Sequence, residues 1–63
     1  MDQINCDRFI REGETRMITG LSRSTRYRME REGTFPQKYK LSPSAKAYKL
    51  SEINMWMSTR KAA

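Results

Sequence analysis

The chain has 63 residues, with 13 Lys and Arg against 7 Asp and Glu, and a formal net charge of +6 at pH 7. This length allows one domain at most, over residues 1–63, and leaves no room for a separate catalytic domain. The single cysteine and the lack of histidine exclude an internal disulfide and a zinc-ligand set, so we expect no cofactor and a reducing, cytoplasmic location. No apolar stretch is long enough for a membrane span or a signal-peptide core.

The N-terminal third contains one short apolar segment and one helix. Residues 1–7 are polar, and we expect them to be loosely ordered. Two adjacent apolar residues at 9–10 predict a short strand or an anchoring segment. A helix is predicted up to residue 19, beginning around residue 14, because Gly13 costs up to about 1 kcal/mol in a helix interior. Gly20 then supplies the left-handed conformation that ends this helix.

A second helix is predicted directly after this turn. Ser22 is a suitable N-cap, the helix extends to about Glu32, and Gly33 ends it. Leu21, Thr25 and Met29 fall at four-residue intervals, which predicts one narrow buried stripe.

The second helix is rich in arginine, and helix N-termini and guanidinium groups are suited to phosphates and guanine edges. The predicted DNA contacts on this helix are Ser22, Arg23, Ser24, Thr25, Arg26, Tyr27, Arg28 and Arg31. A solvated helix stabilised by its own Arg26–Glu30 and Arg28–Glu32 pairs is the alternative. Tyr27 is predicted either to contact a phosphate through its hydroxyl or to pack.

Alternating apolar and charged residues on both sides of a Ser-Pro turn predict a two-stranded hairpin over about 38–49. Lys38, Lys40 and Lys46 lie on it, and they suit phosphate contact or the protection of exposed strand edges. Ser51 is predicted to cap a last helix.

The remaining apolar residues are assigned to the core, because so short a chain needs its large side chains there. On the last helix, one face carries Ile53, Trp56 and Met57. The other residues assigned to the core are Phe9, Met17, Ile18, Phe35, Tyr39 and Tyr48.

These elements predict a mainly α fold with a small β-hairpin, a winged helix-turn-helix. In this fold the helix at about 22–32 enters the major groove of double-stranded DNA, and the wing at about 38–49 flanks it. The chain offers no paired nucleophile and base, which argues against an enzyme.

From Arg8 to Arg60 the chain resembles the AlpA-like family of prophage regulators, within the MerR- and excisionase-type winged-helix group. The matching residues are Thr19-Gly20-Leu21-Ser22-Arg23-Ser24-Thr25, Tyr27-Arg28, Glu32-Gly33-x-Phe35-Pro36, Lys40-Leu41, Pro43, Tyr48 and Ser51-Glu52-Ile53-x-x-Trp56. Four positions depart from the family pattern, because Arg26 and Glu30, and also Thr15 and Arg16 on the first helix, stand where aliphatic residues are common. We therefore expect Arg26 to face outward with Glu30 and to join the DNA surface.

The resemblance implies a transcriptional regulator of a phage, prophage or integrative element, associated with the nucleoid. It equally allows an excisionase that bends attachment-site DNA for a recombinase. Self-association on DNA, an integrase and RNA polymerase are the partners these roles imply. A basic protein-interaction module, such as an anti-repressor, is an alternative from another class.

Overall fold

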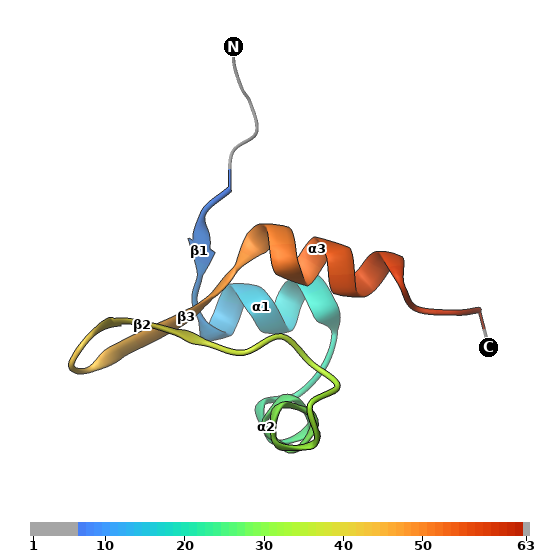
Figure 1. The fold of residues 1–63 in the computed structure, drawn as a ribbon, viewed down its shortest axis with the longest axis horizontal. Coiled ribbons are helices and arrows are strands. Elements are labelled where there is room, and N and C mark those ends of the chain that lie inside the picture. The colour runs from blue at the N-terminus through green and yellow to red at the C-terminus, as the bar shows by residue number, and fades with distance from the viewer. Residues whose placement is uncertain (1–6, 63) are drawn as a thin grey trace, which may run out of the picture.

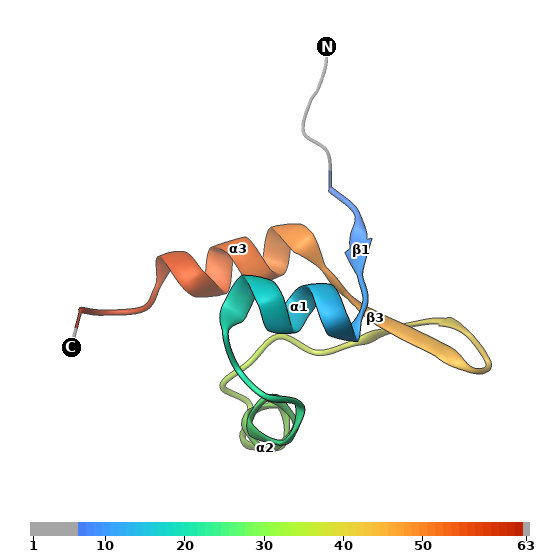
Figure 2. The ribbon, with the colours of Figure 1, turned by 180° about the vertical axis from the view of Figure 1, so that it is seen from behind.

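The computed structural model describes residues 7–62, and its elements follow the predicted order. They are β1 (Phe9–Ile10), α1 (Glu12–Thr19), α2 (Arg23–Glu32), β2 (Tyr39–Ser42), β3 (Ala45–Lys49) and α3 (Leu50–Ser58). In Figure 1, α1 and α3 lie across the page while α2 is seen end-on below them, and the β2–β3 hairpin projects to one side. Figure 2 shows the same arrangement from behind. Two helices joined by a tight turn and followed by a hairpin form a winged helix-turn-helix.

The helix-turn-helix is built by local backbone chemistry. Gly20 ends α1 at φ 75° and Gly33 ends α2 at φ 80°, both in the left-handed region that favours glycine. The hydroxyl of Ser22 accepts a hydrogen bond from the Thr25 backbone N–H at 3.3 Å, as an N-cap does. These predicted boundaries are confirmed.

The predicted start of α1 is wrong by two residues. The helix begins at Glu12 rather than near residue 14, with Gly13 inside its first turn. Glu12 and Glu14 both lie in that turn, where carboxylates interact favourably with the helix dipole and offset the glycine.

The sheet is antiparallel, with strand order β1-β3-β2. Ile10 pairs with Tyr48 on β3, and on the other side of β3 Lys46 pairs with Lys40. Residues directly opposite each other share a face and side chains alternate along a strand. Ile10, Tyr48, Lys46 and Lys40 therefore lie on one face of the sheet.

The core lies between this face and the helices. Ile10, Phe35, Tyr48 and Ile53 are buried, and Ile18, Leu21, Met29, Leu50, Trp56 and Met57 pack against them. The Phe35 ring meets the rings of Tyr48 and Trp56 edge-on at 5.4 and 4.8 Å between centroids.

Three predicted core residues are solvent-exposed. Met17 is 86% exposed because α1 buries the adjacent Ile18 and Thr15 instead, and consecutive helix residues cannot share a face. Phe9 and Tyr39 lie on the other face of the sheet, where both remain exposed at its edges, and contact each other at 5.8 Å between ring centroids.

Ser51 does not cap α3, which begins at Leu50 after Lys49. Its backbone N–H and hydroxyl instead both donate to the Asp7 carboxylate at 3.0 Å. Asp7 is therefore held to α3, contrary to the loose segment predicted for residues 1–7; residues 1–6 lie outside the described part. Within residues 7–62, no helix has the length and apolar character needed to cross a membrane.

Candidate nucleic-acid interface

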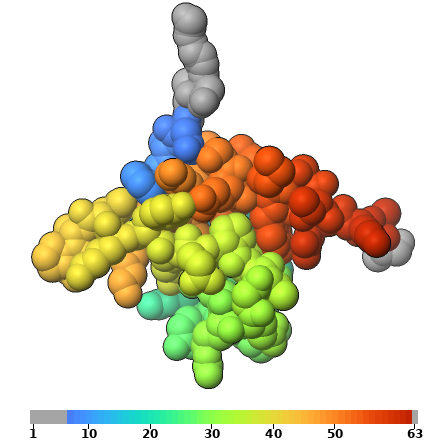
Figure 3. Space-filling model, viewed as in Figure 1, coloured from blue at the N-terminus to red at the C-terminus, as the bar shows by residue number. Residues whose placement is uncertain are grey.

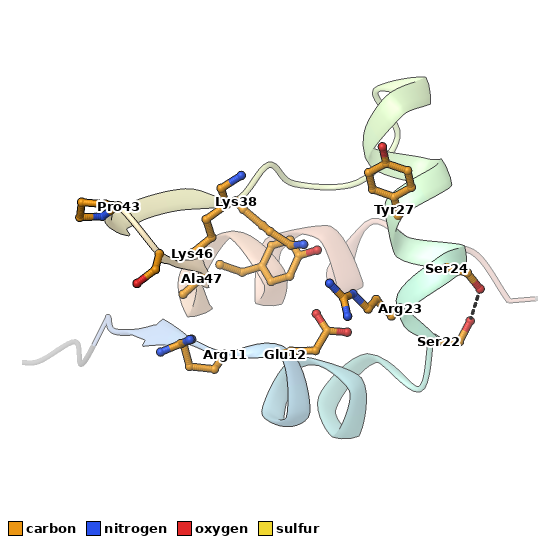
Figure 4. Close-up of a pocket in the computed structure, with 12 residues that line it drawn as sticks. Arg11, Glu12, Ser22, Arg23, Ser24, Tyr27, Lys38, Pro43, Lys46 and Ala47 are labelled. Atoms are coloured by element: carbon orange, nitrogen blue, oxygen red, sulfur yellow. Dashed lines mark hydrogen bonds between the residues drawn. The ribbon is translucent and has the colours of Figure 1, made fainter.

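An open recess separates the hairpin from α2, and Figure 3 shows these two elements projecting from the body on either side of it. Its lining residues come from the start of α1, the N-terminal half of α2, the hairpin and the segment leading into it. They are Arg11, Glu12, Ser22, Arg23, Ser24, Tyr27, Lys38, Pro43, Ser44, Lys46, Ala47 and Tyr48. The close-up in Figure 4 shows Arg23 reaching in from α2 beside Glu12, with Lys38 and Lys46 on the hairpin side. The recess is therefore predominantly cationic.

One face of α2 is fully open to solvent. Ser24, Tyr27, Arg28 and Arg31 are all exposed, and their spacing of i, i+3, i+4 and i+7 places them on one stripe. Arg23 is exposed beside this stripe, on the side facing the recess. Within residues 7–62, none of these arginines forms an ion pair, so the predicted Arg28–Glu32 pair is absent.

Arg26 is buried, which corrects the prediction that it faces outward. Its side chain has 0% exposure, and its guanidinium forms a two-pronged ion pair with Glu12, 14 residues earlier, with Nη1 to Oε1 at 3.0 Å. The Arg26 Nε also donates to the Leu21 carbonyl at 3.2 Å, so the buried charge has partners on two sides. We remove Arg26 from the predicted contacts. Thr25 is half-buried and accepts a hydrogen bond from the Ser22 hydroxyl, and its contact with DNA stays a prediction.

Each partner alters the ionisation of the other. The hydrogen bond from Arg26 holds the pKa of Glu12 below its ordinary value, and the positive charges of Lys38 and Arg23 act in the same direction. Burial lowers the pKa of Arg26, but the hydrogen bond and charge of Glu12 outweigh burial and raise it. Both groups are therefore charged at neutral pH.

Glu30 is also engaged away from the exposed face. The Tyr48 hydroxyl donates a hydrogen bond to Glu30 Oε2, which joins α2 to β3. Burial raises the pKa of Tyr48, and the hydrogen bond to Glu30 raises it further, so Tyr48 remains a donor at neutral pH. Glu12 and Glu30 are thus engaged by Arg26 and Tyr48 rather than by the exposed arginines, and Glu32, also on α2, forms no ion pair within residues 7–62.

The hairpin carries two lysines in direct opposition. Lys40 pairs with Lys46 across the β2–β3 ladder, on the face that continues from buried Tyr48. Like charges directly opposite each other are unfavourable in a free sheet. The Lys38 ammonium lies on the same side, 5.7 Å from the Tyr48 ring centroid.

The structure thus brings most of the predicted contact residues around one recess and one helix face. Ser22, Arg23, Ser24, Tyr27, Lys38 and Lys46 line the recess; Arg28, Arg31 and Lys40 are exposed beyond it. Sequence reasoning missed Arg11 and Glu12, which reach the recess from the start of α1. No local pattern marks them, because their placement depends on how α1 packs against α2.

Comparison with known proteins assigns the chain to a family. The model of the family described as "Prophage CP4-57 regulatory protein (AlpA)" matches residues 8–61. The chain belongs to the AlpA family. It is also 39% identical over 62 residues to "Uncharacterized protein ORF88" of Enterobacteria phage P4, a match covering 98% of this chain and 70% of that protein.

Membership of the AlpA family identifies the chain as a phage-associated regulatory protein. In this chain Arg26 is buried and paired with Glu12, and Glu30 is half-buried and accepts a hydrogen bond from the Tyr48 hydroxyl.

Proposed function

We propose that this AlpA-family protein is a sequence-specific regulator that inserts α2 into the major groove of double-stranded DNA. The observation that carries the proposal is the exposed arginine face of α2, because Arg23, Arg28 and Arg31 form no ion pair within residues 7–62. Arginines that were paired with glutamates of the same helix would attract a polyanion less strongly.

The dimensions of α2 are compatible with this role. Its 10 residues give a length of about 15 Å, and a helix of about 10–12 Å diameter fits a major groove about 12 Å wide. Arg28 and Arg31 lie on the outward stripe, where guanidinium groups would meet base edges or phosphates. Arg23 and Ser24 would contact the backbone nearest the helix N-terminus.

We infer that the hairpin binds the flanking phosphate backbone. Lys40 and Lys46 stand opposite each other at a cost to the free protein, and a phosphate between them would remove that repulsion. Lys38 and Lys46 face Arg23 across the recess, so one DNA strand would be held from two sides.

Footprinting across the protein's own gene and a neighbouring integrase gene and attachment site tests this proposal. We expect one discrete protected site overlapping a promoter, at near-physiological salt with excess random duplex. A run of phased sites with bending would indicate the excisionase role instead. No binding to any duplex at low salt would refute a DNA-binding function and favour a protein-interaction module.

The arginine face is tested by Arg28→Ala, with Arg16→Ala as the matched control. Arg16 is exposed on α1 and lies outside the recess, so it carries the same charge without the same position. We expect Arg28→Ala to lower the ratio of specific to random affinity by about 5- to 150-fold, the range for one bidentate arginine–guanine contact. Equal losses on specific and random DNA would refute base reading by Arg28.

A further inference from the structure

Tyr27 is an aromatic residue that the fold does not use. Its side chain is 57% exposed in the middle of the cationic face of α2, and within residues 7–62 its hydroxyl has no hydrogen-bond partner. The packing role that the sequence allowed for Tyr27 is therefore not filled. An exposed apolar ring among charged side chains indicates that the ring packs against a binding partner.

The ring is held in place by its neighbour on the same stripe. The Arg31 guanidinium lies 5.7 Å from the Tyr27 ring centroid, one helical turn later, within the range of a cation–π contact. Tyr27 also lines the recess toward the hairpin, and Figure 4 shows its ring standing on α2 above Ser24. Tyr27 thus presents a flat apolar surface at the centre of the proposed reading face.

Resting on the proposed function, we propose that Tyr27 reads thymine, by packing its ring against the 5-methyl group in the major groove. That methyl is the apolar group on the major-groove edge of the base pairs, and apolar side chains are what recognise it. Burying one methyl against the ring corresponds to a gain of about fourfold in affinity. Arg31, beside the ring, is positioned to contact the adjacent phosphate or guanine.

The competing role is a phosphate contact through the Tyr27 hydroxyl. The two roles depend on different atoms, so Tyr27→Phe separates them from Tyr27→Ala. Phenylalanine keeps the ring that packs on a methyl group and removes the hydroxyl that would donate to a phosphate. Because Tyr27 is exposed, neither variant is expected to change the melting temperature.

The experiment first selects binding sites for the wild-type protein from random duplex DNA. Each thymine of the selected site is then replaced singly by deoxyuridine, which removes only the methyl group. Affinities of the wild type, Tyr27→Phe and Tyr27→Ala are measured by fluorescence anisotropy on each duplex. We expect one thymine whose demethylation weakens the wild type and Tyr27→Phe by about fourfold and leaves Tyr27→Ala unchanged.

Two results would overturn the inference while the proposed function stands. One is a selected site at which no uracil substitution depends on the residue at position 27. The other is a loss of affinity for the selected site that is as large for Tyr27→Phe as for Tyr27→Ala, which would assign the contact to the hydroxyl. If the wild type selects no sequence over random duplex, both the inference and the proposed function fail.

Discussion

The opposed lysines of the wing lead to a prediction in which stability and affinity change in opposite directions. Replacing Lys46 or Lys40 by glutamine removes one of the two ammonium groups carried by directly opposed residues of the β2–β3 ladder. At a separation of about 6 Å their repulsion is about 0.7 kcal/mol in water, and salt at 0.15 M reduces it to about 0.3 kcal/mol. Each variant should therefore be more stable than the wild type by a few tenths of a kcal/mol.

The same substitution should weaken DNA binding. Each phosphate neutralised by a lysine contributes about 0.9 to the slope of log affinity against log salt, which corresponds to about eightfold in affinity at 0.1 M salt. We expect Lys46→Gln to lose about eightfold on specific and random duplex alike and to reduce the salt slope by about 0.9. Chemical denaturation measures the stability, and anisotropy titrations at several salt concentrations measure the slope.

Lys49→Gln is the matched control, because Lys49 lies on the same strand but on the other face. Its ammonium lies 5.1 Å from the Tyr39 ring centroid, away from the recess. The control should leave the salt slope close to that of the wild type. A Lys46→Gln variant that is less stable than the wild type, or that keeps the full slope, would refute the assignment of the wing to phosphate.

Four further predictions concern the polar contacts beneath α2. Glu12→Gln leaves the fully buried Arg26 charge uncompensated and should cost about 1–3 kcal/mol in the free energy of unfolding, since Glu12 itself is 41% exposed. Arg26→Met leaves a carboxylate that water can reach and should cost about 1 kcal/mol or less, so a larger loss than for Glu12→Gln in urea denaturation would contradict this account. Because Arg26 lowers the pKa of Glu12, the pair stabilises the fold above about pH 4.5, and this stabilisation is lost as the pH falls through the lower pKa of the folded state. In thermal melts from pH 7 to 3, the melting temperature of Glu12→Gln should therefore decline less than that of the wild type. Tyr48→Phe removes the donor to Glu30 and should cost about 1–2 kcal/mol, and an unchanged melting temperature would show that this hydrogen bond contributes nothing.

The features that the sequence predicts well are those determined by neighbouring residues. The ends of the two helices are set by the backbone or side chain of single residues, Gly20, Ser22 and Gly33, so their roles can be predicted from the sequence alone. The hairpin can be predicted for the same reason, because side-chain alternation and a Ser-Pro turn are local features of the sequence.

The errors arise where a distant residue competes with a local partner. Arg26 has Glu30 four residues away on its own helix, but in the fold its guanidinium forms two hydrogen bonds with Glu12 on α1. Ser51 has the chemistry of an N-cap, but Asp7 takes both its hydrogen bonds from 44 residues away. Local rules rank only local partners, so such choices become visible only when the elements are packed.

The buried charges of α2 and its exposed charges are two consequences of one arrangement. Arg26 ties α2 to α1 through Glu12, and Glu30 ties it to β3 through Tyr48. Lys46 lies on β3 two residues before Tyr48, so this hydrogen bond also joins α2 to the strand that carries Lys46. Glu12 and Glu30 therefore hold α2 against α1 and β3, and neither forms an ion pair with an exposed arginine of α2 within residues 7–62. Arg23 also lowers the pKa of Glu12, so without Arg26 the Glu12 carboxylate would be free to attract Arg23; the Arg26–Glu12 pair thus ties α2 to α1 and leaves Arg23 exposed.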